Sequence, residues 1–428
     1  MSWPVVSKEF RLIDDEIETF IRDIVDKVRE ALKYESKINV LVSTNTELNA
    51  FVIQDNSIVI NAGAILQCNN VKEFIAIIAH EVGHIVGGHI NSYLASIPEF
   101  ESAGIIAMLL GAAASICARN SAPLMAGISG GQSMAMHMAA GKIRQNEAIA
   151  DTNAIQAVKQ LRWNVIDGFI SLHEKINKDS MIHNKYLATH PLSENRIIKL
   201  KQEYQKERNK KFPKSKTILI EDMQNKFEII KLKAESLIRS PQLIIEAYRS
   251  FKSERYIYVT AIALHRMGKH NEVQTILNDL MTKSSEPYID PAHCAEILAM
   301  SLINLKKFSE AIKLCWKFIE KDKLAKYKDL RIIYANAVIE GNLNKQNITR
   351  AIRVIIRILK DKNYSEIWLL LGKLYDLNEN PDKASLCAAE AALTNYDKEN
   401  AMYHAKKVLN SKDNICKQRA QDIINIYE

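Results

Sequence analysis

The motif His80-Glu81-x-x-His84 has the residue types and the spacing to hold a metal ion. In a helix, positions four apart lie about 40° from one another around the axis, so both imidazoles leave the same face. This suits two nitrogen ligands of one zinc ion, and the glutamate between them can reach a metal-bound water without binding the metal. The motif also occurs by chance, but the apolar residues 74–79 before it form the buried-helix pattern that it requires. The spacing therefore indicates metal-assisted hydrolysis.

The third ligand decides which kind of site the sequence can build. A histidine ten residues after the first would complete one known pattern, but that position is Ile90, and His89 falls one residue short. The other option is an acid from a second helix, and Glu147 and Asp151 lie four apart in an otherwise apolar segment. Two acids on a buried face are costly unless they are paired or bound to a metal. We therefore expect the third ligand here, with an exposed acidic face as the alternative.

The elements that must position these residues are also readable from the sequence. Asn70, with Glu73 three positions later, is typical of a helix N-terminus, and Gly87-Gly88 is typical of a helix end, so we predict a helix at about 71–87. Apolar residues at helical or alternating spacing predict the remaining elements. These are helices at 9–34, 142–160 and 164–178 and strands at 38–42, 49–52 and 57–61.

Composition and charge limit the class of protein. The 428 residues are 47% hydrophobic and 25% charged, with only 14 Gly and 9 Pro, which favours a mostly helical globular chain over a disordered, collagenous or polytopic membrane protein. Residues 1–200 carry 18 basic and 21 acidic side chains, and residues 201–428 carry 40 basic and 29 acidic ones. The basic half suits a solvated Lys-rich surface or an acidic partner or membrane surface. Without a basic run interleaved with aromatics, we expect no nucleic-acid partner.

The uncharged run 103–118 bears on membrane contact. It is shorter than the ~20 apolar residues of a spanning helix, so we expect no transmembrane span. A buried helix, or a peripheral membrane contact through 103–118, fits its length better. The six cysteines show no metal-binding spacing and are too few for a dense disulfide framework.

From about residue 240 the chain reads as helices in repeated units. Val273, Ala311, Ala351 and Ala384 fall in register, with spacings of 38, 40 and 33 residues against about 34 for a tetratricopeptide repeat. The unit that begins at Ser365 matches that repeat most closely. Its matching residues are Trp368, Leu371, Gly372, Tyr375, Ala384 and Ala391. A non-repetitive helical domain is the alternative.

Together these motifs resemble the HtpX/BepA-type zinc metallopeptidases, and most closely the BepA-like branch, in which tetratricopeptide repeats follow the peptidase domain. The resemblance rests on His80-Glu81-x-x-His84, on Arg144-x-x-Glu147-x-x-x-Asp151, on Ser57–Asn61, and on Thr189-His190-Pro191 with Arg196.

The resemblance implies a role for each residue of the motifs. His80, His84 and Glu147 would bind one Zn²⁺ ion, with water in the fourth position. Glu81 would take a proton from that water and pass it to the leaving amine. Asp151 would hydrogen-bond a ligand histidine, with proton donation as the alternative.

The loop after residue 180 and one strand also receive roles from the resemblance. His190 would either fill the open zinc position and hold the enzyme shut, or donate a hydrogen bond to the oxyanion, and Arg196 would orient its loop. We expect 57–61 to be an edge strand that pairs with an extended peptide.

The predicted architecture is an α+β zincin-type metallopeptidase domain, mostly helical with a small sheet, followed by an all-α tetratricopeptide solenoid. The expected divisions are 1–205 for the peptidase, 206–239 for a helical connector and 240–428 for the repeats.

The predicted function is zinc-dependent endopeptidase cleavage of protein or peptide substrates. The alternative is a repeat-based chaperone or adaptor with a mostly latent peptidase. The resemblance implies protein quality control in the bacterial periplasm, with the outer-membrane assembly machinery as a partner of the repeats. The first ten residues lack a signal-peptide pattern, so a chain that starts there is expected to be cytoplasmic.

Overall fold

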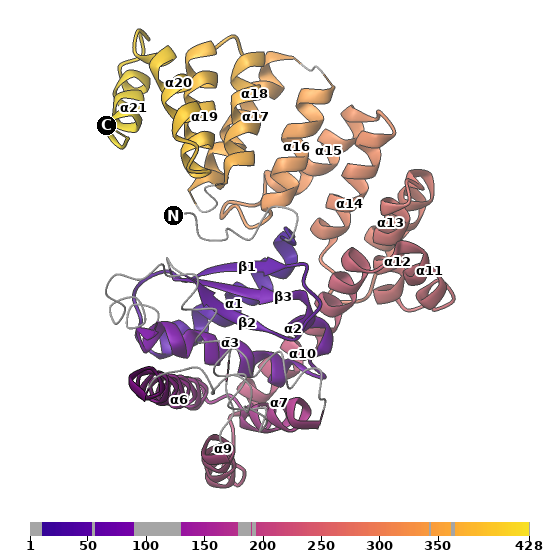
Figure 1. The fold of residues 1–428 in the computed structure, drawn as a ribbon. Helices are drawn as coiled ribbons and strands as arrows, with labels where there is room; N and C mark the ends of the chain where they lie inside the picture. Colours follow the sequence, from indigo (N-terminus) through magenta and orange to yellow (C-terminus); the bar gives the residue numbers. More distant parts are fainter. Residues whose placement is uncertain are drawn as a thin grey trace. The chain divides into compact units, whose positions relative to one another are not determined.

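The computed structural model describes residues 11–53, 56–89, 130–178, 190, 194–341, 344–360 and 364–427, with only the backbone of 130–140 and 194. The run 103–118, where we expected a buried helix or membrane contact, lies outside these residues. Contacts divide the chain into two units, Met1–Ile238 and Arg239–Glu428 (Figure 1). In the described part of the chain, no helix combines the length and the hydropathy needed to cross a membrane.

A three-stranded sheet forms one layer of the first unit. Its strands are β1 (Asn39–Ser43), β2 (Ala50–Ile53) and β3 (Ser57–Asn61), in the order β1-β3-β2. Strand β3 pairs in parallel with β1 and antiparallel with β2, and all five of its residues are buried. The expectation that 57–61 is an edge strand is therefore wrong. Among the strands that the structure describes, the edges are β1 and β2, because β3 uses both of its hydrogen-bonding sides.

The first helix is shorter than its apolar pattern predicts. Helix α1 spans Asp15–Ala31, whereas the sequence predicts 9–34. Asp14 caps it by accepting a hydrogen bond from the Ile17 amide at 3.0 Å. Just before that cap, Arg11 forms a β-bridge with Ser43 of β1, so the chain there is extended. Pairing with β1 therefore keeps the chain at Arg11 extended, and the helix begins only at Asp15.

The motif helix forms where the sequence predicts it. After the short α2 (Ala62–Gln67), α3 spans Val71–Val86, and the Asn70 side chain accepts from the Glu73 amide. The Glu73 carboxylate accepts from the Asn69 amide at 2.8 Å and from the Ser171 hydroxyl at 2.6 Å. The N-terminus of α3 is therefore tied to a second helix, α7 (Ile166–Lys178).

Helix α6 (Gly130–Gln160) crosses α3 at the motif itself. A Cβ on Gly83 would lie 2.4 Å from the Ala150 carbonyl oxygen, so only glycine allows the two backbones to approach this closely. The Asn153 side chain donates to the Gly83 carbonyl at 3.0 Å and fixes the crossing. The glycine inside the motif thus places the α6 carboxylates beside the histidines.

Helices α9 (Glu194–Glu207) and α10 (Lys214–Ile238) complete the first unit. Phe227 of α10 stacks on Phe74 at 5.0 Å and on Phe20 at 6.1 Å between ring centroids. Because α10 buries its apolar face in this core, residues 206–238 of the expected connector pack as part of the first unit.

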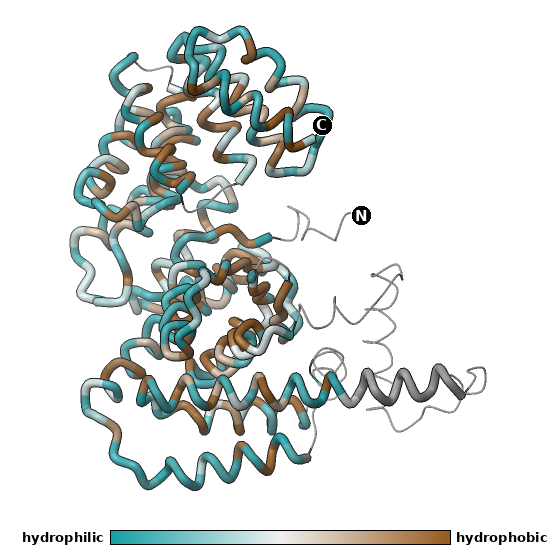
Figure 2. Tube along the Cα trace, turned by 90° about the vertical axis from the view of Figure 1, so that its left-hand side faces the viewer, coloured by the Kyte–Doolittle hydropathy of each residue, from teal (hydrophilic) through white to brown (hydrophobic). Residues whose placement is uncertain are grey.

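The second unit contains only helices in its described residues, and each packs against the next along the chain (Figure 1). Hydrophobic and hydrophilic residues both occur along each helix, as expected of helices with one buried face (Figure 2). They are α11 (Pro241–Tyr248), α12 (Glu254–Arg266), α13 (His270–Lys283), α14 (Pro291–Asn304), α15 (Phe308–Ile319), α16 (Lys328–Glu340), α17 (Lys345–Leu359), α18 (Ser365–Leu377), α19 (Pro381–Thr394), α20 (Lys398–Val408) and α21 (Asn414–Asn425).

Candidate metal centre

Three side chains converge between α3 and α6. The Nε2 atoms of His80 and His84 lie 3.1 Å apart. The two Glu147 carboxylate oxygens lie 3.2 Å from His80 Nε2 and 3.1 Å from His84 Nε2. Tetrahedral bonds of about 2.0–2.2 Å place neighbouring ligand atoms about 3.3–3.6 Å apart, close to these spacings. Two imidazoles and a carboxylate are also a donor set that zinc takes, so the residues fit the ion.

The side chain of Asp151 sets the orientation of the first histidine. Its Oδ1 lies 2.9 Å from His80 Nδ1, which leaves Nε2 directed at the other ligands. Burial acts to raise the pKa of Asp151, but Arg196 and His80 lower it overall. A carboxylate held ionised in this way suits a hydrogen-bond acceptor better than a proton donor.

Arg196 of α9 binds the carboxylates of both Glu147 and Asp151. Its guanidinium contacts Asp151 at 2.6 and 3.0 Å and Glu147 at 2.9 Å. We expected Arg196 to orient the His190 loop; in the described residues it binds the two carboxylates of α6. This pairing orients Glu147 and offsets the cost of burying two negative charges.

Glu81 lies in the same cluster but does not join the converging ligand atoms. It is 1% exposed, and neither carboxylate oxygen has a hydrogen-bond partner among the described residues. Its Oε1 lies 3.5 Å from His190 Nε2. Burial raises the pKa of Glu81. Such a carboxylate can accept a proton from water without first breaking a hydrogen bond.

His190 comes from far along the chain and joins the group. Its Nδ1 lies 3.5 Å from Glu147 Oε1, and the ligand atoms of His80, His84, Glu147 and His190 all lie within 4.8 Å of one another. Its Nε2 donates to the Ala50 carbonyl of β2 at 3.1 Å. His190 therefore contacts both the candidate metal site and the edge of the sheet.

His89 contacts His84, which we did not predict from the sequence. Its Nδ1 lies 2.8 Å from His84 Nδ1, so it serves the second ligand histidine as Asp151 serves the first. Gly88 adopts a φ of +66°, which glycine favours, and this turn brings His89 back over the end of α3. The signal in the sequence is the Gly87-Gly88 pair, which we interpreted only as a helix stop.

The electrostatics of the cluster favour a cation. Burial lowers the pKa of His80, but Glu147 and Asp151 outweigh burial and raise that pKa to about 10. Burial lowers the pKa of His84 to about 4, so this imidazole stays neutral, as a metal ligand must. The two carboxylates thus attract one positive charge to His80, and a metal dication can supply it instead of a proton.

The geometry defines a metallopeptidase site: a histidine pair on one helix, an acid from a second helix, and a separate buried glutamate. Residues 14–204 match the model of Peptidase family M48. The chain therefore carries a Peptidase family M48 domain within its first unit and is a metallopeptidase. A search of the curated proteins found no match to the chain.

Proposed function

We propose that the protein is a zinc-dependent endopeptidase that cleaves polypeptides in protein quality control. The observation that carries the proposal is the convergence of His80, His84 and Glu147 beside the buried carboxylate of Glu81, whose oxygens have no hydrogen-bond partner among the described residues. When bound, zinc would acidify a water and polarise the scissile carbonyl. His80, His84 and Glu147 would hold the ion, and Glu81 would accept the proton of the attacking water and return it to the leaving amine.

The edge strand β2 offers a place for the substrate backbone. The Asn61 amide donates to the Asn49 carbonyl at 3.1 Å, so the ladder alternation turns the backbone groups of Ala50 and Val52 away from β3. An extended peptide can pair with these groups beside the metal centre. The substrate-pairing role expected of 57–61 thus passes to its neighbour.

Endopeptidase action is tested by the products. We expect the full chain with zinc to cut a reduced, unfolded protein such as casein at internal bonds, with mass spectrometry showing fragments that lack both original termini. Release of single terminal residues alone would contradict the proposal.

His190 is proposed as a latch. It lies among the candidate ligand atoms, and it donates a hydrogen bond to the Ala50 carbonyl. A peptide paired with β2 would have to occupy that carbonyl's hydrogen-bonding position. One side chain would therefore block the water position and the peptide edge together, and activity would require the loop to leave, as a shift between two states.

The latch predicts a gain of activity on substitution. His190→Ala should raise basal cleavage or self-cleavage with zinc content unchanged, while His404→Ala in the second unit should change neither. Lower activity at unchanged zinc content would reject the latch and support an oxyanion-binding role, because removing one such donor costs about 10²–10³ in rate.

The second unit is proposed as a tetratricopeptide solenoid that recruits substrates, as in the BepA-like branch. The expected repeat from Ser365 coincides with α18 and α19, and a Cβ on Gly372 would lie 3.4 Å from the Cys387 Cβ, so a small residue suits this crossing. A periplasmic location and the outer-membrane assembly machinery as partner remain part of this proposal. A chaperone or adaptor with a latent peptidase is the second candidate, favoured by the position of His190.

A further inference from the structure

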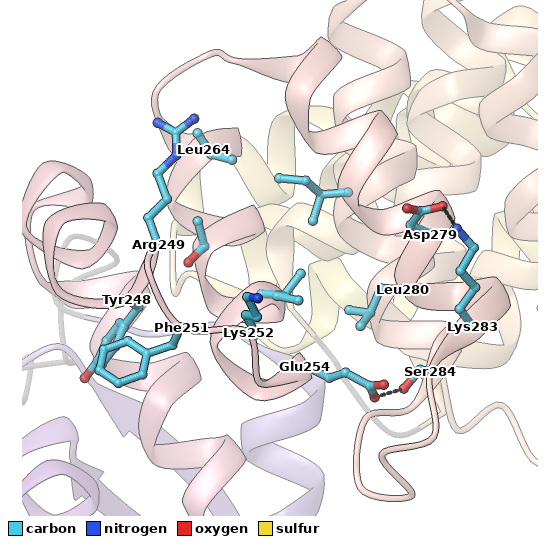
Figure 3. A pocket seen from close by; sticks show the side chains of 13 residues that line it. Tyr248, Arg249, Phe251, Lys252, Glu254, Leu264, Asp279, Leu280, Lys283 and Ser284 are labelled. Atoms are coloured by element: carbon cyan, nitrogen blue, oxygen red, sulfur yellow. Dashed lines mark hydrogen bonds and ion pairs between the residues drawn. The ribbon is translucent and has the colours of Figure 1, made fainter.

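A cavity of about 440 Å³ opens at the start of the second unit, between α11, α12 and α13 (Figure 3). Helix α11 has eight residues, about 12 Å of length, whereas α12 has 13 residues, about 20 Å. Helix α11 is therefore shorter than α12, against which it packs. Ile257, Leu264, Ile276 and Leu280 supply apolar walls to the cavity.

A buried hydroxyl lines this cavity. Thr260 is 5% exposed, and its Oγ1 has no hydrogen-bond partner among the described residues. A buried polar group without a partner is costly, and a ligand with a donor or acceptor would relieve that cost. The walls and the hydroxyl together suit apolar side chains beside a hydrogen-bonding group such as a backbone amide.

Some charged side chains around the cavity have ion-pair or hydrogen-bond partners, and one has no ion-pair partner among the described residues. Asp279 pairs with Lys283 at 2.9 Å, and Glu254 accepts from the Ser285 amide at 3.1 Å. Lys252 lines the same cavity and has no ion-pair partner in the part of the chain that the structure describes. Figure 3 shows Lys252 apart from the two satisfied acids. The rim therefore offers a positive charge to an incoming group.

We propose that this cavity binds a short polypeptide segment that carries apolar side chains next to an acidic one. Its volume lies within the range of small-ligand sites and holds about two apolar side chains. Thr260 would pair with a backbone amide or carbonyl of the segment, and Lys252 would pair with its carboxylate. The site lies wholly in the second unit and does not depend on the peptidase assignment.

The test uses the full chain with Glu81→Gln, which prevents cleavage of the probe. The probe is a fluorescein-labelled peptide, Gly-Ser-Asp-Leu-Phe-Asp-Ser-Gly, and its binding is measured by fluorescence anisotropy. Lys252→Glu and Thr260→Val should each weaken binding about threefold to tenfold. Lys412→Glu, which makes the same charge change elsewhere in the second unit, should leave the affinity within about twofold.

Two further peptides separate the contributions. Replacing Leu and Phe by Ser should abolish binding, and replacing both Asp by Lys should weaken it at least as much as Lys252→Glu does. Any one of three results would overturn the proposal. These are equal affinity for the Ser peptide, no binding of the probe at about 1 mM, and unchanged affinity in both cavity variants. Thermal unfolding identifies a misfolded variant, and in that case the remaining variant decides.

Discussion

Glu81→Gln will keep about one zinc per chain and will slow the cleavage of an unfolded protein by about 10²–10⁴. Glu81 is buried in the cluster without a hydrogen-bond partner among the described residues, and it is not one of the three converging ligands. The amide keeps the size of the side chain but cannot accept a proton. Zinc content by mass spectrometry, thermal unfolding and cleavage of casein are the measurements.

A matched control for this substitution is Glu174→Gln, on the exposed face of α7. This variant should keep both zinc and activity. Undiminished cleavage by Glu81→Gln would exclude Glu81 as the base. Loss of zinc in the same variant would instead make Glu81 a ligand, against the geometry described above.

Glu147→Ala will lose the metal and with it nearly all cleavage. Glu147 supplies the third ligand atom, and its removal also takes from Arg196 one of the two carboxylate partners that the structure describes. Removing one partner of a buried ion pair costs about 3–5 kcal/mol of stability. We therefore expect both a low zinc content and a lower melting temperature.

His80→Ala separates these two effects. It removes a ligand but leaves the contacts of Arg196 with Glu147 and Asp151 intact. Its zinc content should fall as far as that of Glu147→Ala, with a smaller loss of stability measured in the presence of a chelator. Stoichiometric zinc in either variant would be incompatible with the proposed ligand set.

Much of the site could be predicted because helical spacing alone fixes it. His80 and His84 share a face of α3, and Glu147 and Asp151 share a face of α6, whichever way the helices pack. That the two faces meet depends on the close backbone approach at Gly83, which the spacing does not show. The family resemblance implied only that His80, His84 and Glu147 bind one ion.

The expectations that failed depend on tertiary contacts. The three apolar residues between Ser57 and Asn61 indicate a buried strand, but they do not show which strands lie on either side of it. The start of α1 depends on the pairing of Arg11 with β1, and the contact of His89 depends on the left-handed turn at Gly88. None of these has a periodic signal in the sequence.

X-ray absorption at the zinc edge of the purified protein tests the central claim most directly. We expect one zinc per chain, bound by the imidazole nitrogens of His80 and His84 and a carboxylate oxygen of Glu147 at about 2.0–2.2 Å, with a His190 nitrogen or water in the fourth position. This ligand signature should disappear in His80→Ala and Glu147→Ala and persist in Glu81→Gln. A chain that takes up no zinc, or a zinc whose ligand shell is the same in all three variants, would contradict it.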